Sequence, residues 1–190
     1  MDDRPRCSWP GSNPLMVAYH DSEWGVPCHD DRKLFEYIVL DAFQAGLSWA
    51  IVLNKREGFR QAFNNFEPEK IALYALERIQ ELENNPAIIR NKLKIRATIT
   101  NAQAFLKVQQ EFGSFDKYIW QFVGNQPIIR SPQTDSEIGA TSPESDAMSA
   151  DLKKRGFKFV GSTICYAFMQ GAGLINDHIT SCFRYTQVYD

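Results

Sequence analysis

Two pairs of cysteine and histidine side chains, one near each end of the sequence, could bind a metal ion. Twelve residues separate Cys7 from His20, and three separate His178 from Cys182. Two thiolates and two imidazoles form a ligand set that suits a tetrahedral zinc ion. Four protein ligands leave no open position for a substrate, so one zinc here would be structural. It would join the N-terminal segment to the C-terminal segment.

The spacing of these residues leaves other interpretations open. A His-x3-Cys pair in a helix places both side chains on one face. A packed histidine beside a buried thiol has the same pattern and needs no metal. The adjacent Cys28 and His29 could also compete as ligands.

A carboxylate falls on the apolar side of a helix predicted over residues 30–45. Apolar side chains recur there at spacings of three and four, which marks one buried helix face: Leu34, Phe35, Ile38, Ala42 and Ala45. Asp41, seven residues after Leu34, lies on or beside that face. Burying an unpaired charge is costly, so Asp41 should be paired, hydrogen-bonded or functional. An aspartate bonded to a core arginine or to the backbone fits equally well.

The segment from Leu152 to Cys182 contains a candidate phosphate site. Basic residues end one predicted helix, two glycines bound the sequence GFKFVG, and an apolar helix should follow. The free N–H groups at the start of a helix bind phosphate without reading base sequence. The candidate phosphate-binding residues are Lys153, Lys154, Arg155, Lys158 and Gly161. A helix-hairpin-helix holds the DNA backbone in this way, although an ordinary turn with a basic rim has the same pattern.

Helices account for nearly all of the periodic sequence that must position these groups. The clearest begins at the cap Ser142 and Pro143 and ends before Gly156, with acidic residues in its first turn and basic residues in its last. Other helices are expected over residues 47–56, 88–111 and 115–123, with two short ones in 67–84. Residues 1–30 are expected to be irregular but packed, and 125–141 to be a surface loop. With almost no strand alternation and no internal repeat, the fold class predicted is all-α.

Length and composition set further bounds. The 190 residues, 44% of them hydrophobic, are enough for a single domain spanning 1–190, with two helical sub-lobes. No apolar run could cross a membrane and the N-terminus has no secretory signal pattern, so a cytoplasmic protein with reduced cysteines is expected. A net charge of −2 argues against bulk attraction to nucleic acid but permits local basic patches. A monomer is the default expectation.

Five segments, in order and with compatible spacing, resemble the signature segments of the DNA-3-methyladenine glycosylase I family of bacterial base-excision repair enzymes: YHDSEWGVP, QAGLSW, NKRE, LKKRGFKFVGSTICYAFMQ and NDH. The resemblance runs from Cys7 to Cys182. It implies an all-α helix-hairpin-helix glycosylase fold. It also implies a zinc ion held by Cys7, His20, His178 and Cys182, in preference to Cys28 and His29.

The resemblance further implies that the protein excises 3-methyladenine from double-stranded DNA, releasing the free base. Gly46 and Leu47 would enter the base stack, and Leu47 suits this as an apolar wedge. Trp49 would stack on the flipped base and Tyr19 would line the pocket, completed by Trp9 and Trp24. A cationic base on an aromatic ring gains about 1–2 kcal/mol when desolvated.

The sequence departs from the family at the carboxylate that would recognise the base. The family usually has Glu at the position of Asp41, so the arm here is shorter by about 1.5 Å. Phe43 stands where a polar residue is common, and we expect both residues in the pocket. Asp41 is the predicted catalytic residue, reading the base edge and stabilising positive charge on the sugar.

Two expectations concern the mechanism. Asp177 is more consistent with orienting His178 than with catalysis. The absence of a lysine just after the hairpin indicates a monofunctional enzyme that uses water and leaves an abasic site. The alternative to this enzyme is a zinc-stapled helix-hairpin-helix DNA-binding homologue with lost or altered base excision.

Overall fold

The computed structural model describes residues 3–188, which form ten α-helices, three single-turn 3-10 helices and two short strands. The α-helices are α1 Pro14–Ser22, α2 Asp31–Gln44, α3 Trp49–Ala62, α4 Pro68–Ile71, α5 Leu76–Asn84, α6 Lys92–Phe112, α7 Phe115–Trp120, α8 Pro143–Lys154, α9 Ser162–Gly171 and α10 Arg184–Gln187. The 3-10 helices are Asn64–Phe66, Gln121–Val123 and Asp135–Glu137, and the strands are β1 Ile128–Ile129 and β2 Ile175–Asn176. The predicted all-helical character is confirmed.

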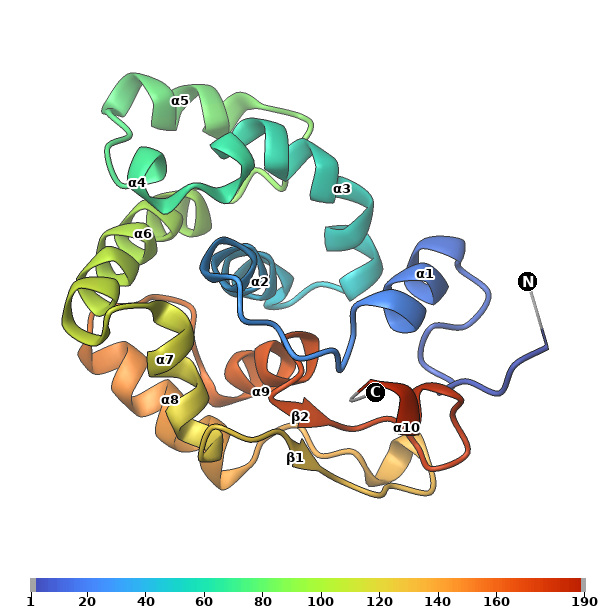
Figure 1. Ribbon diagram of the computed structural model, residues 1–190. Helices are drawn as coiled ribbons and strands as arrows, with labels where there is room; N and C mark the ends of the chain where they lie inside the picture. Colours follow the sequence, from blue (N-terminus) through green and yellow to red (C-terminus); the bar gives the residue numbers. More distant parts are fainter. Residues whose placement is uncertain (1–2, 189–190) are drawn as a thin grey trace.

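Helix α2 lies at the centre of the molecule. It packs against α3, α6, α7 and α9 (Figure 1), and every residue from Leu34 to Phe43 is buried. A helix buried on all sides needs apolar residues around its whole circumference. Its start is held by Asp30, whose side chain accepts a hydrogen bond from the backbone N–H of Lys33. The predicted helix over residues 30–45 is therefore confirmed.

Two layers of helix enclose α2 (Figure 1). Helices α3, α4, α5 and the first part of α6 lie on one side, and α7, α8 and α9 lie on the other. The carboxylate of Asp31 accepts hydrogen bonds from the backbone N–H groups of Phe115 and Asp116, each at 2.8 Å, and so ties the start of α2 to the start of α7. The division into two sub-lobes within one domain stays a prediction.

Helix α8 begins and ends as its capping residues predict. The Ser142 hydroxyl accepts from the backbone N–H of Ser145, and the Ser145 hydroxyl bonds back to the Ser142 N–H. Pro143 occupies the first turn, where a missing N–H costs nothing. After the helix, Gly156 has a φ of +96°, a conformation that glycine adopts most easily.

Two expectations about irregular segments are wrong in part. Residues 14–22 form helix α1, which Asn13 caps and Pro14 begins. Only Tyr19 and His20 of this helix are buried, so it has little apolar periodicity to detect. The loop over residues 125–141 contains β1, which pairs in parallel with β2 through Ile128 opposite Ile175. This loop is therefore attached to the segment that precedes His178.

The two ends of the described chain lie together. The N-terminal segment runs beside the C-terminal segment (Figure 1), and the Phe183 backbone N–H donates to the Pro5 carbonyl at 2.9 Å. The guanidinium of Arg4 lies 4.0 Å from the centre of the Phe183 ring. No helix within residues 3–188 is both long and apolar enough to cross a membrane.

Candidate functional site

A cavity of about 290 Å³ opens where α1, α2, the start of α3 and α9 meet. This volume suits a single small ligand at the lower end of the usual range. The structure brings together here all four predicted base-binding aromatic residues and Asp41. The residues that line the cavity are Trp9, Tyr19, Trp24, Asp41, Gln44, Trp49, Asp135, Ile138, Ala167 and Gln170.

Asp41 reaches the cavity without a polar partner. The residue is 5% exposed, and within residues 3–188 no hydrogen bond or ion pair to its carboxylate is found. The alternative of an aspartate bonded to a core arginine or to the backbone is therefore wrong. Burial raises the pKa of Asp41 well above its usual value, and the charge of Arg56 only partly opposes this shift. A buried carboxylate without a partner is costly unless a ligand supplies one.

The aromatic side chains form adjoining walls of this cavity. The ring centres of Tyr19 and Trp49 lie 5.2 Å apart, and those of Trp9 and Trp24 lie 5.1 Å apart. Trp9 also meets Tyr19 edge to face at 6.3 Å. The indole N–H groups of Trp9 and Trp49 are buried, and neither has a hydrogen-bond partner in the described structure. The cavity thus combines flat electron-rich surfaces with polar groups that remain available to a ligand.

The wedge turn, residues 45–48, connects α2 to α3 beside this cavity. Gly46 has a φ of +80°, a conformation that a residue with a Cβ adopts only with strain. Leu47 is 38% exposed and Ile51, in the next turn of helix, is 44% exposed. The two exposed aliphatic side chains leave an apolar surface at this turn, between the cavity residues Gln44 and Trp49 and the first turn of α3.

Phe43 does not lie in the cavity, so the expectation that placed it there is wrong. Its ring is fully buried and packs against Phe59, with ring centres 4.6 Å apart. Phe43 follows Asp41 by two positions, so the side chains point in different directions around the helix. The following residue, Gln44, lines the cavity instead.

Sequence reasoning missed the cavity residues from the second half of the chain. Asp135 comes from the loop expected to be only surface, and Gln170 comes from α9. One carboxylate oxygen of Asp135 accepts hydrogen bonds from the backbone N–H and the hydroxyl of Ser8. Its other oxygen is buried without a partner in the described structure. No local pattern could have identified Asp135, because the contact with Ser8 spans 127 residues.

The NKRE segment holds the loop that carries Trp24. Arg56 donates two hydrogen bonds to the Glu23 carboxylate, at 2.7 and 2.8 Å, and one to Glu36 at 2.8 Å. Burial alone would raise the pKa of Glu23, but the Arg56 guanidinium holds that pKa down to about 2. Charged pairs of this geometry are strong because the guanidinium is bidentate. Arg56 therefore fixes the position of Trp24 relative to α2 and α3.

Three of the four predicted metal ligands form a compact buried cluster. The ligand atoms of Cys7, His20 and Cys182, which we call the Cys–His cluster, all lie within 4.8 Å of one another. The Cys182 sulfur is 3.5 Å from Nε2 of His20. His178 lies beside them, with its ring centre 5.1 Å from that of His20. Its Nε2 is buried and has no partner in the described structure, so the ring has a free nitrogen available to a metal.

The protonation of Cys182 and His178 suits metal binding, whereas Cys7 would have to lose its proton to join them. The Cys7 thiol donates to the Cys182 sulfur, which lowers the pKa of Cys182 to about 4 and raises that of Cys7. Burial, followed by the nearby charge of His20, lowers the pKa of His178 to about 3. A thiolate and a neutral imidazole are the forms that coordinate a metal.

Two alternatives that the sequence left open for the cluster are not supported by its surroundings. Cys28 and His29 do not join it, since His29 bonds to Asp116 at 2.7 Å and stacks on Trp120. The segment from His178 to Cys182 is not helical, so a shared helix face does not explain their pairing.

The expectation that Asp177 orients His178 is wrong. Asn176 contacts the His178 ring instead, with its side-chain oxygen 2.8 Å from Nδ1. Asp177 accepts hydrogen bonds from Tyr166 at 2.6 Å and from Gln170 at 2.8 Å. It therefore orients Gln170, a residue that lines the cavity.

The hairpin, residues 155–161, joins α8 to α9 as the sequence predicts. Phe157 and Val160 are buried and anchor it in the core. Lys153 and Lys154 are exposed at the end of α8, Lys158 is exposed in the hairpin, and Gly161 is the N-cap of α9. Arg155 differs from these lysines, because its guanidinium is already paired with Glu111 and Asp151. The lysines leave their charge available to an anion, whereas Arg155 does not.

Comparison with known proteins gives matches over almost the whole chain. A family model for methyladenine glycosylase matches residues 9–185. DNA-3-methyladenine glycosylase 1 of Escherichia coli (strain K12) is 50% identical over 180 residues, which cover 95% of this chain and 96% of that protein.

Solved structures agree with the sequence matches. A crystal structure of 3-methyladenine DNA glycosylase I has 52% identity and a TM-score of 0.92, covering 94% of this chain and 98% of the other. A glycosylase I structure from Staphylococcus aureus, described by its recognition of 3-methyladenine, has 35% identity and a TM-score of 0.91, covering 94% and 95%.

Proposed function

The chain belongs to the methyladenine glycosylase family, and from this premise we propose that it is a monofunctional DNA glycosylase that excises 3-methyladenine from alkylated double-stranded DNA. The enzyme flips the damaged nucleotide out of the duplex and hydrolyses its N-glycosyl bond, leaving an abasic site. Similar chains carry this name, and one is described by its recognition of 3-methyladenine. The protein acts as a monomer in this proposal.

The observation that carries the proposal is the unpaired Asp41 carboxylate in an aromatic cavity. 3-Methyladenine in DNA is cationic, so it supplies the positive charge and the N–H donors that Asp41 lacks. Stacked on Trp49 and close to Tyr19, the cation also gains a cation–π attraction of about 1–2 kcal/mol. A neutral adenine has no positive charge, so it gains neither the charge attraction to Asp41 nor the cation–π attraction, and the same cavity discriminates against undamaged bases.

Excision needs little acid catalysis because the base leaves as a neutral molecule. The bond between the base nitrogen and C1′ breaks, and its electron pair goes to the base. Water adds to C1′ and loses a proton. Positive charge develops on the sugar as the bond breaks, and the Asp41 carboxylate stabilises that charge. Fixed charges of this kind in a water-poor site contribute the largest share of many enzymatic rate enhancements.

The shorter arm of Asp41 is compatible with this role. Aspartate reaches about 1.5 Å less than the family's usual glutamate, and we propose that a small helix shift or one bridging water closes the gap. Gln44, Asp135 and Gln170 provide further polar groups around the same base. Phe43, buried against Phe59, supports α2 from behind.

DNA contacts are proposed for two other surfaces. The wedge turn places Gly46 and Leu47 beside the cavity, where Leu47 would fill the gap left by the flipped base. The hairpin and the start of α9, a helix-hairpin-helix, would hold a phosphate through free N–H groups and through Lys153, Lys154 and Lys158. Gly161 gives close backbone access, and Arg155 contributes less because it is ion-paired.

One structural zinc ion is proposed at the Cys–His cluster, with His178 as the fourth ligand. The donor set is correct for tetrahedral zinc, and the buried Nε2 of His178, which has no partner in the described structure, would complete the four ligands. The ion would supply no chemistry to excision. Cys7 and His20 would hold the segment that carries Trp9 and Tyr19 against the C-terminal ligands.

Incubation with methylated DNA, followed by chromatography of the released bases, tests the function. We expect release of 3-methyladenine with little 7-methylguanine. DNA binding without release of any base would instead support a homologue that keeps the fold and has lost excision. Release of 7-methylguanine at a comparable rate would indicate altered base specificity.

A further inference from the structure

Lys94, in the first turn of α6, is a buried cation whose role the proposed mechanism does not include. The residue is 6% exposed. Its ammonium donates to the backbone carbonyls of Phe43, at 3.0 Å, and Ala45, at 2.6 Å. Within residues 3–188 no carboxylate pairs with it. Burial lowers the pKa of Lys94, and these carbonyls, together with the Phe159 ring whose centre lies 5.9 Å from the ammonium nitrogen, offset the cost of desolvation.

The two carbonyls belong to the end of α2, where helix geometry leaves such groups unbonded. The last carbonyls of a helix have no intrahelical donor and carry the negative end of the helix dipole. Many helices close this end with N–H groups from the following residues. Here Leu47 donates to Gln44 at 2.6 Å, and the Lys94 ammonium satisfies Phe43 and Ala45. A cation from another helix therefore fixes how α2 ends.

Both parts of the proposed excision machinery extend from this helix end. Asp41 lies two residues before Phe43, and the wedge turn with Gly46 and Leu47 begins at Ala45 itself. Lys94 does not line the cavity. It therefore influences excision indirectly, through the backbone that carries the wedge turn and the carboxylate.

The same helix also holds the hairpin. Asn101 is 1% exposed and makes two hydrogen bonds with the backbone of Lys158, accepting from its N–H at 2.7 Å and donating to its carbonyl at 3.1 Å. Asn101 follows Lys94 by seven residues. Two helical turns place both side chains on one face, about 10.5 Å apart along the axis. Helix α6 thus sets the distance between the wedge turn and the hairpin.

We propose that Lys94 is a positioning residue for base excision. Its ammonium holds the wedge turn at a fixed distance from the phosphate-binding hairpin, which Asn101 holds on the same helix. This inference rests on the proposed function. When the hairpin grips a phosphate, the rigid spacing directs Leu47 at a defined step of the base stack. Loss of the ammonium frees the wedge turn while the hairpin still binds. The defect then falls on base flipping and not on DNA affinity.

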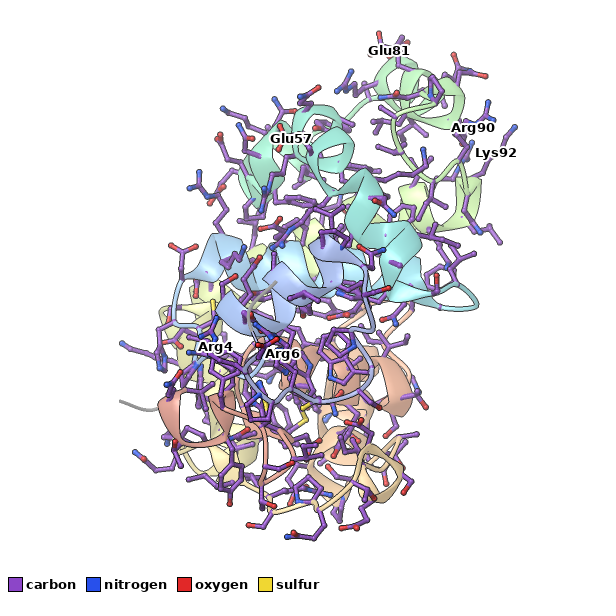
Figure 2. The ribbon with its side chains drawn as sticks, turned by 90° about the vertical axis from the view of Figure 1, so that its right-hand side faces the viewer. Arg4, Arg6, Glu57, Glu81, Arg90 and Lys92 are labelled. Atoms are coloured by element: carbon purple, nitrogen blue, oxygen red, sulfur yellow. The ribbon has the colours of Figure 1, made fainter. Side chains whose placement is uncertain are left out.

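Three variants test the role of the ammonium. Lys94→Met keeps an unbranched apolar side chain, shorter by the nitrogen atom, and removes both hydrogen bonds, whereas Lys94→Arg keeps charge and donors. Lys92→Met is the matched control, since Lys92 starts the same helix, has a 72% exposed side chain and points outward (Figure 2). Each variant is measured for its dissociation constant with methylated duplex DNA and for its single-turnover excision rate at saturating protein.

We expect Lys94→Met to lower the single-turnover rate on the order of 10- to 100-fold, as misplacement of about 1 Å does in other enzymes. Its DNA affinity should change little, and Lys94→Arg should recover most of the rate. Lys92→Met should keep the wild-type rate. Equal losses in rate and affinity for Lys94→Met, or an unchanged rate, would overturn the proposal.

Base flipping is followed separately by the fluorescence of 2-aminopurine placed beside the lesion, which rises when stacking is lost. We expect Lys94→Met to reduce this rise and Asn101→Ala to weaken DNA binding more than it slows excision. If Lys94→Met fails to fold, Lys94→Gln, which keeps a donor without charge, takes its place and should have an intermediate rate. If the fluorescence rise is unaltered in Lys94→Met and in Lys94→Gln, the inference is contradicted.

The wild-type protein separates failure of this inference from failure of the proposed function. If the wild type releases no 3-methyladenine, the proposed function fails whatever the variants do. The fluorescence measurement still tests Lys94 in that case, because flipping does not require cleavage.

Discussion

The cavity and the Cys–His cluster are neighbouring sites with buried polar groups, and they differ in whether those groups contact one another. His20 in the cluster follows Tyr19 in the cavity. The ligand atoms of the cluster lie within 4.8 Å of one another, and the buried Nε2 of the adjacent His178 has no hydrogen-bond partner in the described part of the chain. In the cavity, Asp41 and the indole N–H groups of Trp9 and Trp49 have no hydrogen-bond partner within residues 3–188.

This difference indicates which of the two sites binds and releases a ligand during function. A polar group that is satisfied within the fold, or by a resident ion, stabilises the fold. A buried polar group without a partner destabilises it, so its presence in a folded protein points to a ligand that comes and goes. Substitutions in the two sites should therefore have opposite effects on stability and activity.

The largest effect expected in the cavity is that of Asp41→Asn. Removing the charge that stabilises the transition state should lower kcat/KM by about 10²–10³-fold. The melting temperature should stay the same or rise, because the buried unpaired charge is gone. Excision of 3-methyladenine and thermal melting are measured on the same sample.

A paired carboxylate on the same helix provides the control for that experiment. Glu36 is buried and bonded to Arg56, so Glu36→Gln should lower the melting temperature and affect excision less. Full activity and full binding of free 3-methyladenine in Asp41→Asn would end the assignment of Asp41.

In the cluster, Cys182→Ser should lower stability before it lowers activity. A structural ion at 100 times its dissociation constant adds about 2.7 kcal/mol to the free energy of unfolding. For a chain of this size the melting temperature should fall by about 5–10 °C, and dialysis against a chelator should lower it similarly. Cys28→Ser, a thiol outside the cluster, should change neither the melting temperature nor the metal content. Wild-type protein without bound metal, or unaffected by the chelator, would remove the distinction between the sites.

The dependence of stability on pH should separate Asp41 from all other titrating groups. The folded protein raises the pKa of Asp41 above its usual 3.8, so the protonated form is favoured on folding. The stability that this proton contributes is fully present below pH 3.8 and is lost as the pH rises through the folded pKa. The free energy of unfolding of Asp41→Asn should therefore increase relative to wild type above that pH, by at most about 1.4 kcal/mol per unit. Urea titrations across this range measure the difference, and a constant difference would contradict the raised pKa.

The smallest effect concerns the hairpin, where a free lysine can be compared with a paired arginine. Lys158→Ala should reduce the slope of log affinity against log salt by about 0.9, the value for one phosphate contact. Arg155→Ala breaks ion pairs with Glu111 and Asp151, so it should reduce stability and leave the slope nearly unchanged. Equal slopes for Lys158→Ala and wild type would place the phosphate contact elsewhere.

Much of the frame follows from local sequence. Ser142, Pro143 and Gly156 mark the ends of α8 because capping and left-handed geometry depend on a few adjacent residues. The apolar spacing over residues 30–45 likewise predicts α2, because a helix face repeats every 3.6 residues. Helix α1 was missed because it buries only Tyr19 and His20.

The identity of the cavity residues came partly from the sequence and partly from the fold. The side of α2 that carries Asp41 was predictable from periodicity, and the aromatic residues were predicted from their motifs. The exclusion of Phe43 and the inclusion of Gln44 depended on which neighbouring helix covers which side of α2. Asp135 and Gln170 reach the cavity from segments more than ninety residues away from Asp41.

The sequence by itself determined the helical character, the residue types of both polar sites and the order of the motifs, because these depend on local geometry and composition. Only the tertiary structure decided that, among residues 3–188, Asp41 and Nε2 of His178 have no hydrogen-bond partner and that Lys94 closes the end of α2. Each of these is a statement about hydrogen-bond partners that lie far apart in the chain. Such partners are fixed by how whole helices pack, which no single stretch of sequence contains.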